Sequence, residues 1–146
     1  VPDAPLIDAA SSDGEALFPG EMALVVEDDD DVRRMALEQM VGLGFAVIEA
    51  ESGEEALSLI EGIADIRVVL SDVVMPGLSG LDLARRLRET RPEIAVVLVT
   101  GFARAETPTD LPDVPILAKP WEKDELIAAL ATAMRARGDE EKERGR

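Results

Sequence analysis

The sequence has no cysteine and no histidine among its 146 residues. The absence of cysteine excludes disulfides, thiolate nucleophiles and cysteine-ligated zinc. The absence of histidine excludes Ser-His-Asp triads, histidine metal sites and any phosphohistidine carried by this chain. The sequence also lacks a run of about 18 apolar residues, which is the length that a membrane-spanning helix requires. We therefore expect no membrane span.

Basic residues are scarce. The chain has 15 Lys and Arg against 31 Asp and Glu, which gives a net charge of −16. Binding to nucleic acid depends on basic contacts to phosphate, so we expect no direct nucleic-acid contact. An anionic membrane surface is an equally poor partner for this charge. Hydrophobic residues make up 47% of the chain, which fits one globular domain with tails at this length.

The composition divides the chain into three parts. Residues 1–20 contain three Pro, two Gly and no Lys or Arg, which is typical of a linker. Residues 21–136 carry the regular patterns and are predicted to form the ordered domain. Residues 137–146 are almost wholly charged, so we expect a solvated tail there.

Five short apolar runs alternate with stretches that repeat apolar residues at helical spacing. The runs lack polar alternation, which is typical of strands buried on both faces of a parallel sheet. Helices between such strands form right-handed βαβ units, so the pattern predicts an α/β, doubly wound, three-layer fold. The predicted strands are Met22–Val26, Phe45–Ile48, Ile66–Leu70, Ile94–Val99 and Val114–Ala118.

Local signals mark the ends of several helices. The segment Ser52–Glu55 has the spacing of a capping box. The run Asp29–Asp31 fits an ordinary helix N-terminus, where acidic side chains are favoured. Residues 102–113 contain Pro108 and Pro112, which disrupt a helix interior, so we expect the fourth crossover helix to be short or irregular.

Polar side chains follow four of the five predicted strands. Glu27 and Asp28 follow the first, Asp72 the third, Thr100 the fourth and Lys119 the fifth. Parallel strands end at one edge of the sheet, where ligands bind, so these groups are predicted to converge. Three close carboxylates require a cation, and an oxygen-only ligand set favours Mg²⁺. One carboxylate can then act as a nucleophile toward phosphorus, with the hydroxyl and the ammonium holding phosphoryl oxygens.

Four segments carry a resemblance to a known family. LVVEDDDDVRRM, VVLSDVVMPGLSGLDLARRLR, VVLVTG and ILAKPW resemble the response-regulator receiver domain of two-component signalling. The resemblance covers about residues 22–136, with the landmarks in the family's order. It implies a flavodoxin-like fold with a five-stranded parallel sheet in the order 2-1-3-4-5.

The resemblance also implies a role for each polar residue at the sheet edge. Asp72 would be the phosphoacceptor, Thr100 the switch hydroxyl and Lys119 the phosphate-binding lysine. The implied Mg²⁺ ligands are Glu27, Asp28, Asp72 and the backbone carbonyl of Val74. The Lys119–Pro120 peptide bond would be cis. Residues at the positions of Val74 and Phe102 tune hydrolysis in this family, and both are apolar here, so we expect slow self-dephosphorylation.

Two departures from the family pattern indicate the kind of protein to which this domain belongs. Ile116 occupies the position of the usual aromatic switch residue, and prolines interrupt the fourth helix. Both features resemble receivers attached to hybrid sensor histidine kinases. The implied phosphodonor is a histidine kinase or a histidine phosphotransfer protein. The implied location is cytoplasmic, with any membrane anchor left to other parts of a parent protein.

Other functions fit less well. A haloacid-dehalogenase-like phosphatase would need an acid two residues after its nucleophile, where this chain has Val74, and a large cap insertion, which it lacks. No G-x-G-x-x-G or G-x-x-x-x-G-K motif indicates a nucleotide site. A receiver that serves only as an interaction domain stays open, because Ile116 replaces the switch aromatic.

Two further features have simple structural interpretations. We expect Trp121 to pack in the core. We expect the arginine face formed by Arg85, Arg86 and Arg88 to be solvated.

Overall fold

A computed structural model describes the backbone of residues 17–101 and 110–144. Its strands are β1 (Met22–Val26), β2 (Ala46–Ala50), β3 (Ile66–Asp72), β4 (Ala95–Thr100) and β5 (Ile116–Ala118). Its helices are α2 (Asp30–Gly42), α3 (Gly53–Gly62), α4 (Gly80–Thr90) and α5 (Lys123–Arg144). All five predicted strands are present, with ends that differ from the prediction by at most two residues.

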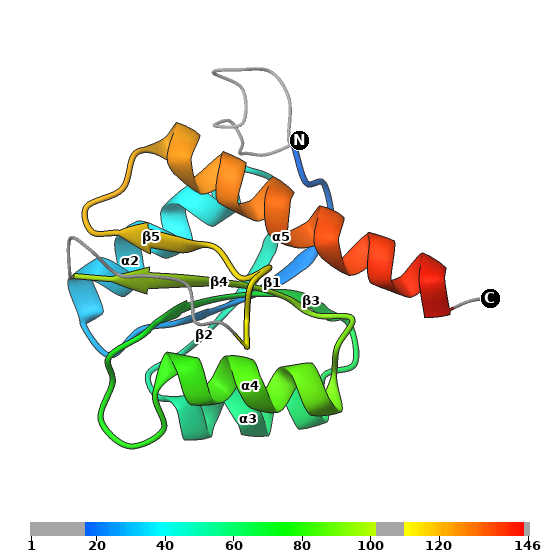
Figure 1. The fold of residues 1–146 in the computed structure, drawn as a ribbon. Coiled ribbons are helices and arrows are strands. Elements are labelled where there is room, and N and C mark those ends of the chain that lie inside the picture. The colour runs from blue at the N-terminus through cyan, green and yellow to red at the C-terminus, as the bar shows by residue number, and fades with distance from the viewer. Residues whose placement is uncertain (1–16, 102–109, 145–146) are drawn as a thin grey trace.

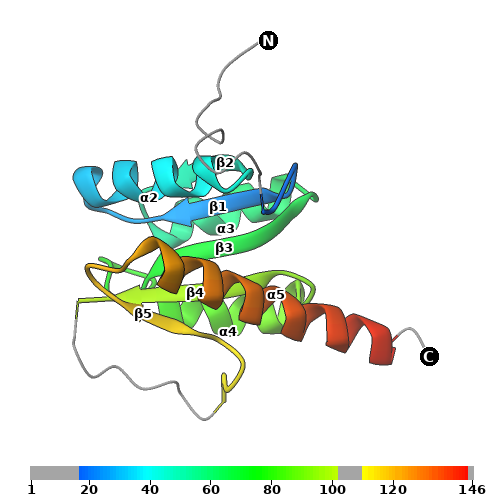
Figure 2. The ribbon, with the colours of Figure 1, turned by 90° about the horizontal axis from the view of Figure 1, so that it is seen from above.

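The five strands form one parallel sheet in the order β2-β1-β3-β4-β5. The predicted fold class and strand order are confirmed. Helices α2 and α5 cover one face of the sheet, and α3 and α4 lie side by side on the other (Figures 1 and 2).

Strand β1 explains why its sequence lacks polar alternation. Ala23 and Val25 pack into the core beneath α2 and α5, whereas Leu24 and Val26 pack into the core beneath α3 and α4. Neighbouring strands of the sheet flank β1 on both sides. Because both faces of β1 are covered, its side chains are apolar in both directions.

The helix starts follow the local signals. Asp29 caps α2 by accepting hydrogen bonds from the backbone N–H groups of Asp31 and Val32, as expected for an acidic helix N-terminus. Ser52 caps α3 by accepting from the N–H of Glu55 at 3.1 Å. The Glu55 side chain accepts in turn from the N–H of Glu51, one residue before the predicted partner of a capping box.

The ordered contacts extend beyond residues 21 and 136. The Phe18 ring stacks on Phe45 with centroids 4.9 Å apart, and the Phe18 N–H donates to the Leu43 carbonyl. Helix α5 continues to Arg144, and its last turns project past the sheet (Figure 1). Glu, Lys and Arg are good helix formers, so a charged segment can continue a helix into solvent. Arg137, which composition places at the start of the solvated tail, is buried.

The predicted fourth crossover helix lies mostly outside the described residues. In the described part, residues 110–113 form turns and no helix. None of the helices that the structure describes is both long enough and apolar enough to cross a membrane.

Candidate functional site

The carboxyl ends of the strands bring the predicted polar residues to one edge of the sheet. Asp72 is the last residue of β3 and lies opposite Val99 of β4. Thr100 ends β4 and lies opposite Ala118 of β5. The N–H of Lys119 donates to the Thr100 carbonyl at 2.8 Å, so the loop after β5 starts at the position where β4 ends.

Three carboxylates meet at this edge. Glu27, Asp28 and Asp72 each offer one oxygen, and these oxygens lie within 4.8 Å of one another. Glu27 and Asp72 are only 4% and 6% exposed, whereas Asp28 is exposed. Close, buried negative charges are costly without a cation. A set of oxygen donors open to solvent on one side fits Mg²⁺, which takes a few carboxylates and keeps several waters.

Lys119 supplies a positive charge to two of these carboxylates. Its Nζ lies 3.0 Å from Oδ2 of Asp72 and 3.1 Å from Oε1 of Glu27. Burial by itself would lower the pKa of Lys119, but the hydrogen bonds to Asp72 and Glu27 outweigh burial and raise the pKa. The ammonium is therefore firmly protonated and bridges the two acids.

Burial raises the pKa of Glu27. The Asp29 N–H and Lys119 act in the opposite direction, the negative charge of Asp72 adds to the rise, and the net pKa stays above its ordinary value. A bound divalent cation would favour the ionised carboxylate that this environment disfavours.

The loop after Asp72 is held close to the sheet. The Val74 N–H points at Oδ1 of Asp72 from 3.4 Å, and Val74 itself is 57% exposed. A Cβ at Gly80 would lie 2.2 Å from the Asp72 carbonyl oxygen, so only glycine lets α4 start this close to β3. Glu54 of α3 accepts from the Leu78 N–H at 3.0 Å and ties the end of the loop to a second helix.

Ile116 stands at the position where the resemblance would place an aromatic residue, near the predicted site residue Thr100. Thr100 is buried. Ile116 is half-buried and packs toward the core beneath α3 and α4. Trp121 packs in the other core, as predicted, and its Nε1 donates to Oε1 of Gln39 at 2.6 Å. The Lys119–Pro120 bond is cis, as predicted.

Sequence reasoning missed two side chains near the site, Arg33 and Glu54. Arg33 is 8% exposed and donates to the Glu27 carbonyl. Its position carries a signal: with Ala36 and Met40 it falls on the buried face of α2, at spacings of three and four residues. An arginine at an inward position indicates a specific partner for its charge.

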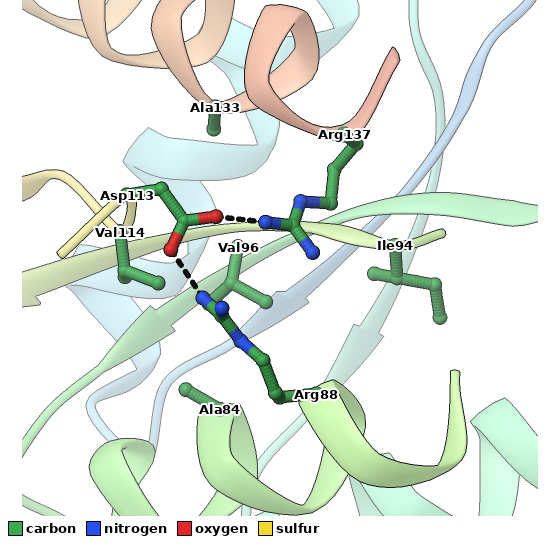
Figure 3. Close-up of a pocket in the computed structure, with 8 residues that line it drawn as sticks. All are labelled: Ala84, Arg88, Ile94, Val96, Asp113, Val114, Ala133 and Arg137. Carbon is green, nitrogen blue, oxygen red and sulfur yellow. Dashed lines mark hydrogen bonds and ion pairs between the residues drawn. The ribbon is translucent and has the colours of Figure 1, made fainter. Parts of the chain in front are cut away.

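A second polar cluster lies away from this edge, near the start of β4. Asp113 accepts from the guanidinium groups of Arg88 on α4 and Arg137 on α5 (Figure 3). Arg85 pairs with Asp110 at 2.7 Å. The prediction that this arginine face is solvated holds for Arg85 and Arg86, which are exposed. Arg88 is only partly exposed, because the turns after residue 109 supply its partner Asp113. The pocket shown in Figure 3 lies between these groups, and their ion pairs and neighbouring apolar side chains fill it.

Comparisons with known proteins agree with this geometry. The family model of the response regulator receiver domain matches residues 23–131. The sensor kinase CckA of Brucella abortus is 41% identical over 90 residues, which are 61% of this chain and 10% of that protein. The chain thus spans a small part of that relative.

Solved structures show the same fold. The receiver domain of the hybrid histidine kinase CckA is 31% identical, with a TM-score of 0.63, and the match covers 77% of this chain and 98% of that one. The response regulator TrrA of Thermotoga maritima, solved in complex with Mg²⁺ and BeF, is 28% identical, with a TM-score of 0.69 over 77% of this chain and 98% of that one.

Proposed function

The chain belongs to the response regulator receiver domain family, and on that premise we propose that Asp72 accepts a phosphoryl group from a phosphohistidine donor in a Mg²⁺-dependent reaction. One observation carries the proposal. The Asp72 carboxylate lies at the sheet edge, 3.0 Å from the Lys119 ammonium and within a cluster of three carboxylates. This arrangement pairs a nucleophile with a cation for the transferred group.

In the proposed step, a carboxylate oxygen of Asp72 attacks phosphorus, and the phosphorus–nitrogen bond to the donor imidazole breaks. Lys119 holds a phosphoryl oxygen as negative charge develops on it. Thr100 offers its hydroxyl to another phosphoryl oxygen. The residues that would hold Mg²⁺ are Glu27, Asp28, Asp72 and the carbonyl of Val74. When bound, the ion neutralises charge on the phosphoryl group. The chain thus acts on itself and not on a separate substrate.

Phosphorylation would add about −1.5 to −2 charge at the end of β3. Lys119 would then turn from Glu27 toward the phosphoryl group. Its backbone N–H bonds the Thr100 carbonyl, so the loops after β4 and β5 would move together. Ile116 has no ring to swing inward, so we propose that the output depends on these loops and not on an aromatic switch.

The proposed donor is a histidine kinase or a histidine phosphotransfer protein. The likeness to the CckA receiver supports a place beside a hybrid histidine kinase. Loading of phosphohistidine requires ATP, so the proposal includes a cytoplasmic location. We also propose that the phosphoryl group is lost slowly, because exposed Val74 cannot position an attacking water. Phe102, the second residue of that prediction, lies outside the described residues.

The test is intact-mass analysis after incubation with acetyl phosphate, with and without Mg²⁺. The expected result is one phosphoryl adduct on the wild type that needs Mg²⁺ and is absent in Asp72→Asn. The matched control is Asp65→Asn, which changes an exposed aspartate just before β3 and should keep the adduct. An Asp72→Asn protein that is still phosphorylated would overturn the assignment. A wild type that stays unmodified would favour the interaction-only receiver, for which Ile116 is the supporting feature.

A further inference from the structure

We propose that Arg33 is a positioning residue for the metal site, because it fixes the peptide group that joins Glu27 to Asp28. This inference rests on the proposed function. Arg33 would bind neither Mg²⁺ nor the phosphoryl group itself. Its effect would be exerted through the backbone of the two acids.

Arg33 is an unusually buried cation. Arg33 is the fourth residue of α2, and its side chain is only 10% exposed. Burial of a guanidinium is costly unless its N–H groups have partners. Nε donates to Oε1 of Glu49 at 2.8 Å, and Nη2 donates to Oδ1 of Asp30 at 2.6 Å. Both acceptor side chains are more than half exposed, so these ion pairs alone do not explain why the arginine turns inward.

The inward contact is to the backbone. Nη1 donates to the Glu27 carbonyl at 2.9 Å, and this hydrogen bond is buried. The Glu27 N–H donates to the Ala50 carbonyl at 3.1 Å, and Oε2 of Glu27 accepts from the Asp29 N–H at 3.1 Å. Arg33 thus completes a set of bonds that holds Glu27 by its N–H, its carbonyl and its side chain.

The carbonyl contact has a geometric consequence. A peptide group is planar, so the direction of the Glu27 carbonyl sets the direction of the Asp28 N–H and the position of the Asp28 Cα. Asp28 is exposed and has no described hydrogen bond through its side chain, so its backbone must place it. Arg33 therefore orients the pair of acids relative to each other. Partners of this kind outside the ligand shell typically change metal affinity about 10- to 100-fold when they are removed.

A purely electrostatic role and a positioning role of Arg33 predict opposite changes in Mg²⁺ affinity when Arg33 is removed, so the inference can be tested. If Arg33 acted only as a nearby positive charge, its removal would strengthen Mg²⁺ binding by relieving repulsion. If Arg33 positions the acids, its removal weakens Mg²⁺ binding despite the lost repulsion. Arg34 is the matched control, because it is the next residue of α2, carries the same charge and is exposed.

The experiment measures Mg²⁺ affinity of the full chain by calorimetry for the wild type, Arg33→Met, Arg33→Lys and Arg34→Met. We expect Arg33→Met to bind Mg²⁺ about 10-fold more weakly, and Arg34→Met to bind it as well as the wild type or more tightly. Arg33→Lys keeps the charge but loses the planar fork of donors, so it should also bind more weakly. In phosphorylation by acetyl phosphate, the Mg²⁺ concentration for half-maximal rate should rise while the rate at saturating Mg²⁺ recovers.

Unchanged or tighter binding in both Arg33 variants would overturn the inference. If Arg33→Met fails to fold, Arg33→Lys decides the question, since it retains the charge. A merely structural role would lower the unfolding temperature without shifting the Mg²⁺ dependence. The proposed function fails separately: a wild type that binds Mg²⁺ but takes no phosphoryl group would refute phosphotransfer and leave the affinity comparison intact.

Discussion

The ammonium nitrogen of Lys119 lies 3.0 Å from Oδ2 of Asp72, although 47 residues separate the two along the chain. The same nitrogen lies 3.1 Å from Oε1 of Glu27. One lysine therefore neutralises part of the charge on two buried carboxylates that would also bind a divalent cation. Lysine and metal ion are competing sources of positive charge in one small volume.

This competition gives a prediction for Lys119→Met. Without the ammonium, the carboxylates lack their cation, so Mg²⁺ should raise the unfolding temperature more in the variant than in the wild type. Phosphorylation should nevertheless slow by about 100-fold or more, because no cation of the chain holds the phosphoryl oxygen. Thermal unfolding with and without Mg²⁺ and the rate of adduct formation measure the two effects. Lys123→Met, an exposed lysine of α5, controls for loss of one positive charge. An equal gain from Mg²⁺ in Lys119→Met and wild type would contradict the argument.

A second prediction concerns the loop after Asp72, which Glu54 holds. Glu54→Ala removes the acceptor of the Leu78 N–H and should lower the free energy of unfolding by about 1 kcal/mol. Glu54→Gln keeps an acceptor oxygen and should lose less. Gly77 has φ of +77°, and a Cβ there would lie 2.7 Å from Oε2 of Glu54. Gly77→Ala should therefore cost less stability in the Glu54→Ala background than in the wild type.

Denaturant unfolding of the two single variants and the double variant measures this coupling. The strain of the positive φ should persist in both backgrounds, and only the clash with the Glu54 carboxylate should disappear. Strictly additive losses would show that Glu54 does not lie against Gly77 in solution.

The positions of the site residues could be predicted because they depend on chain topology. Glu27, Asp72 and Thr100 each follow a buried apolar run, and parallel strands end at one edge, so their convergence needs no knowledge of side-chain packing. The same holds for Lys119 after β5. The predicted strand ends lie within two residues of the observed ones. At β2, β3 and β4 the prediction stops too early, because these strands continue through the polar residues that follow the apolar runs (Glu49, Ser71 and Thr100).

The contacts of Arg33, Glu54 and Arg137 could not be predicted in the same way. Each is a long side chain whose partner belongs to a different element, and that partner depends on which loop lies beside the helix. Helical spacing does place Arg33 on the inward face of α2, but it does not identify the Glu27 carbonyl as the acceptor. Composition also misled at the C-terminus, because charged residues favour both solvent exposure and helix formation.

A third prediction concerns the loss of stability at acid pH and the contacts that Arg91, just after α4, makes with the end of α3. Arg91 donates to the carbonyls of Ile60 and Ala64 at the end of α3 and pairs with Glu93. Burial by itself would raise the pKa of Glu93, but the Arg91 hydrogen bond and charge outweigh burial and lower the pKa. A carboxyl with a lowered pKa stabilises the folded state above its unfolded pKa, and this stability is lost as pH falls through the folded pKa.

The free energy of unfolding should therefore fall between about pH 5 and pH 3, and Glu93→Gln should flatten part of that slope. Chemical unfolding of both proteins across this range measures the difference. Glu89→Gln removes an exposed carboxylate of α4 and controls for the change in net charge. Parallel pH profiles for wild type and Glu93→Gln would show that the pair with Arg91 contributes nothing.

The last prediction concerns the end of the domain. Arg137 is buried, and its pair with Asp113 ties α5 to the turn before β5 (Figure 3). Arg137 also donates to the Pro92 carbonyl at 2.9 Å, which ties α5 to the segment before β4. A chain that ends after residue 136 leaves Asp113 with Arg88 as its remaining partner in Figure 3. Because Arg88 still pairs with Asp113, we expect the free energy of unfolding to fall by about 2 kcal/mol. This is less than the loss expected for a buried charge that has no partner left.

Denaturant unfolding of chains that end after residue 136, after Gly138 and after Arg144 separates this anchor from the helix that follows it. If Arg137 is the anchor, the chain ending after Gly138 should regain most of the stability, and Arg137→Met in the full chain should lose as much as the shortest chain does. If stability instead rises only when residues 139–144 are restored, the helical extension itself stabilises the fold, and the Arg137–Asp113 pair is incidental to it.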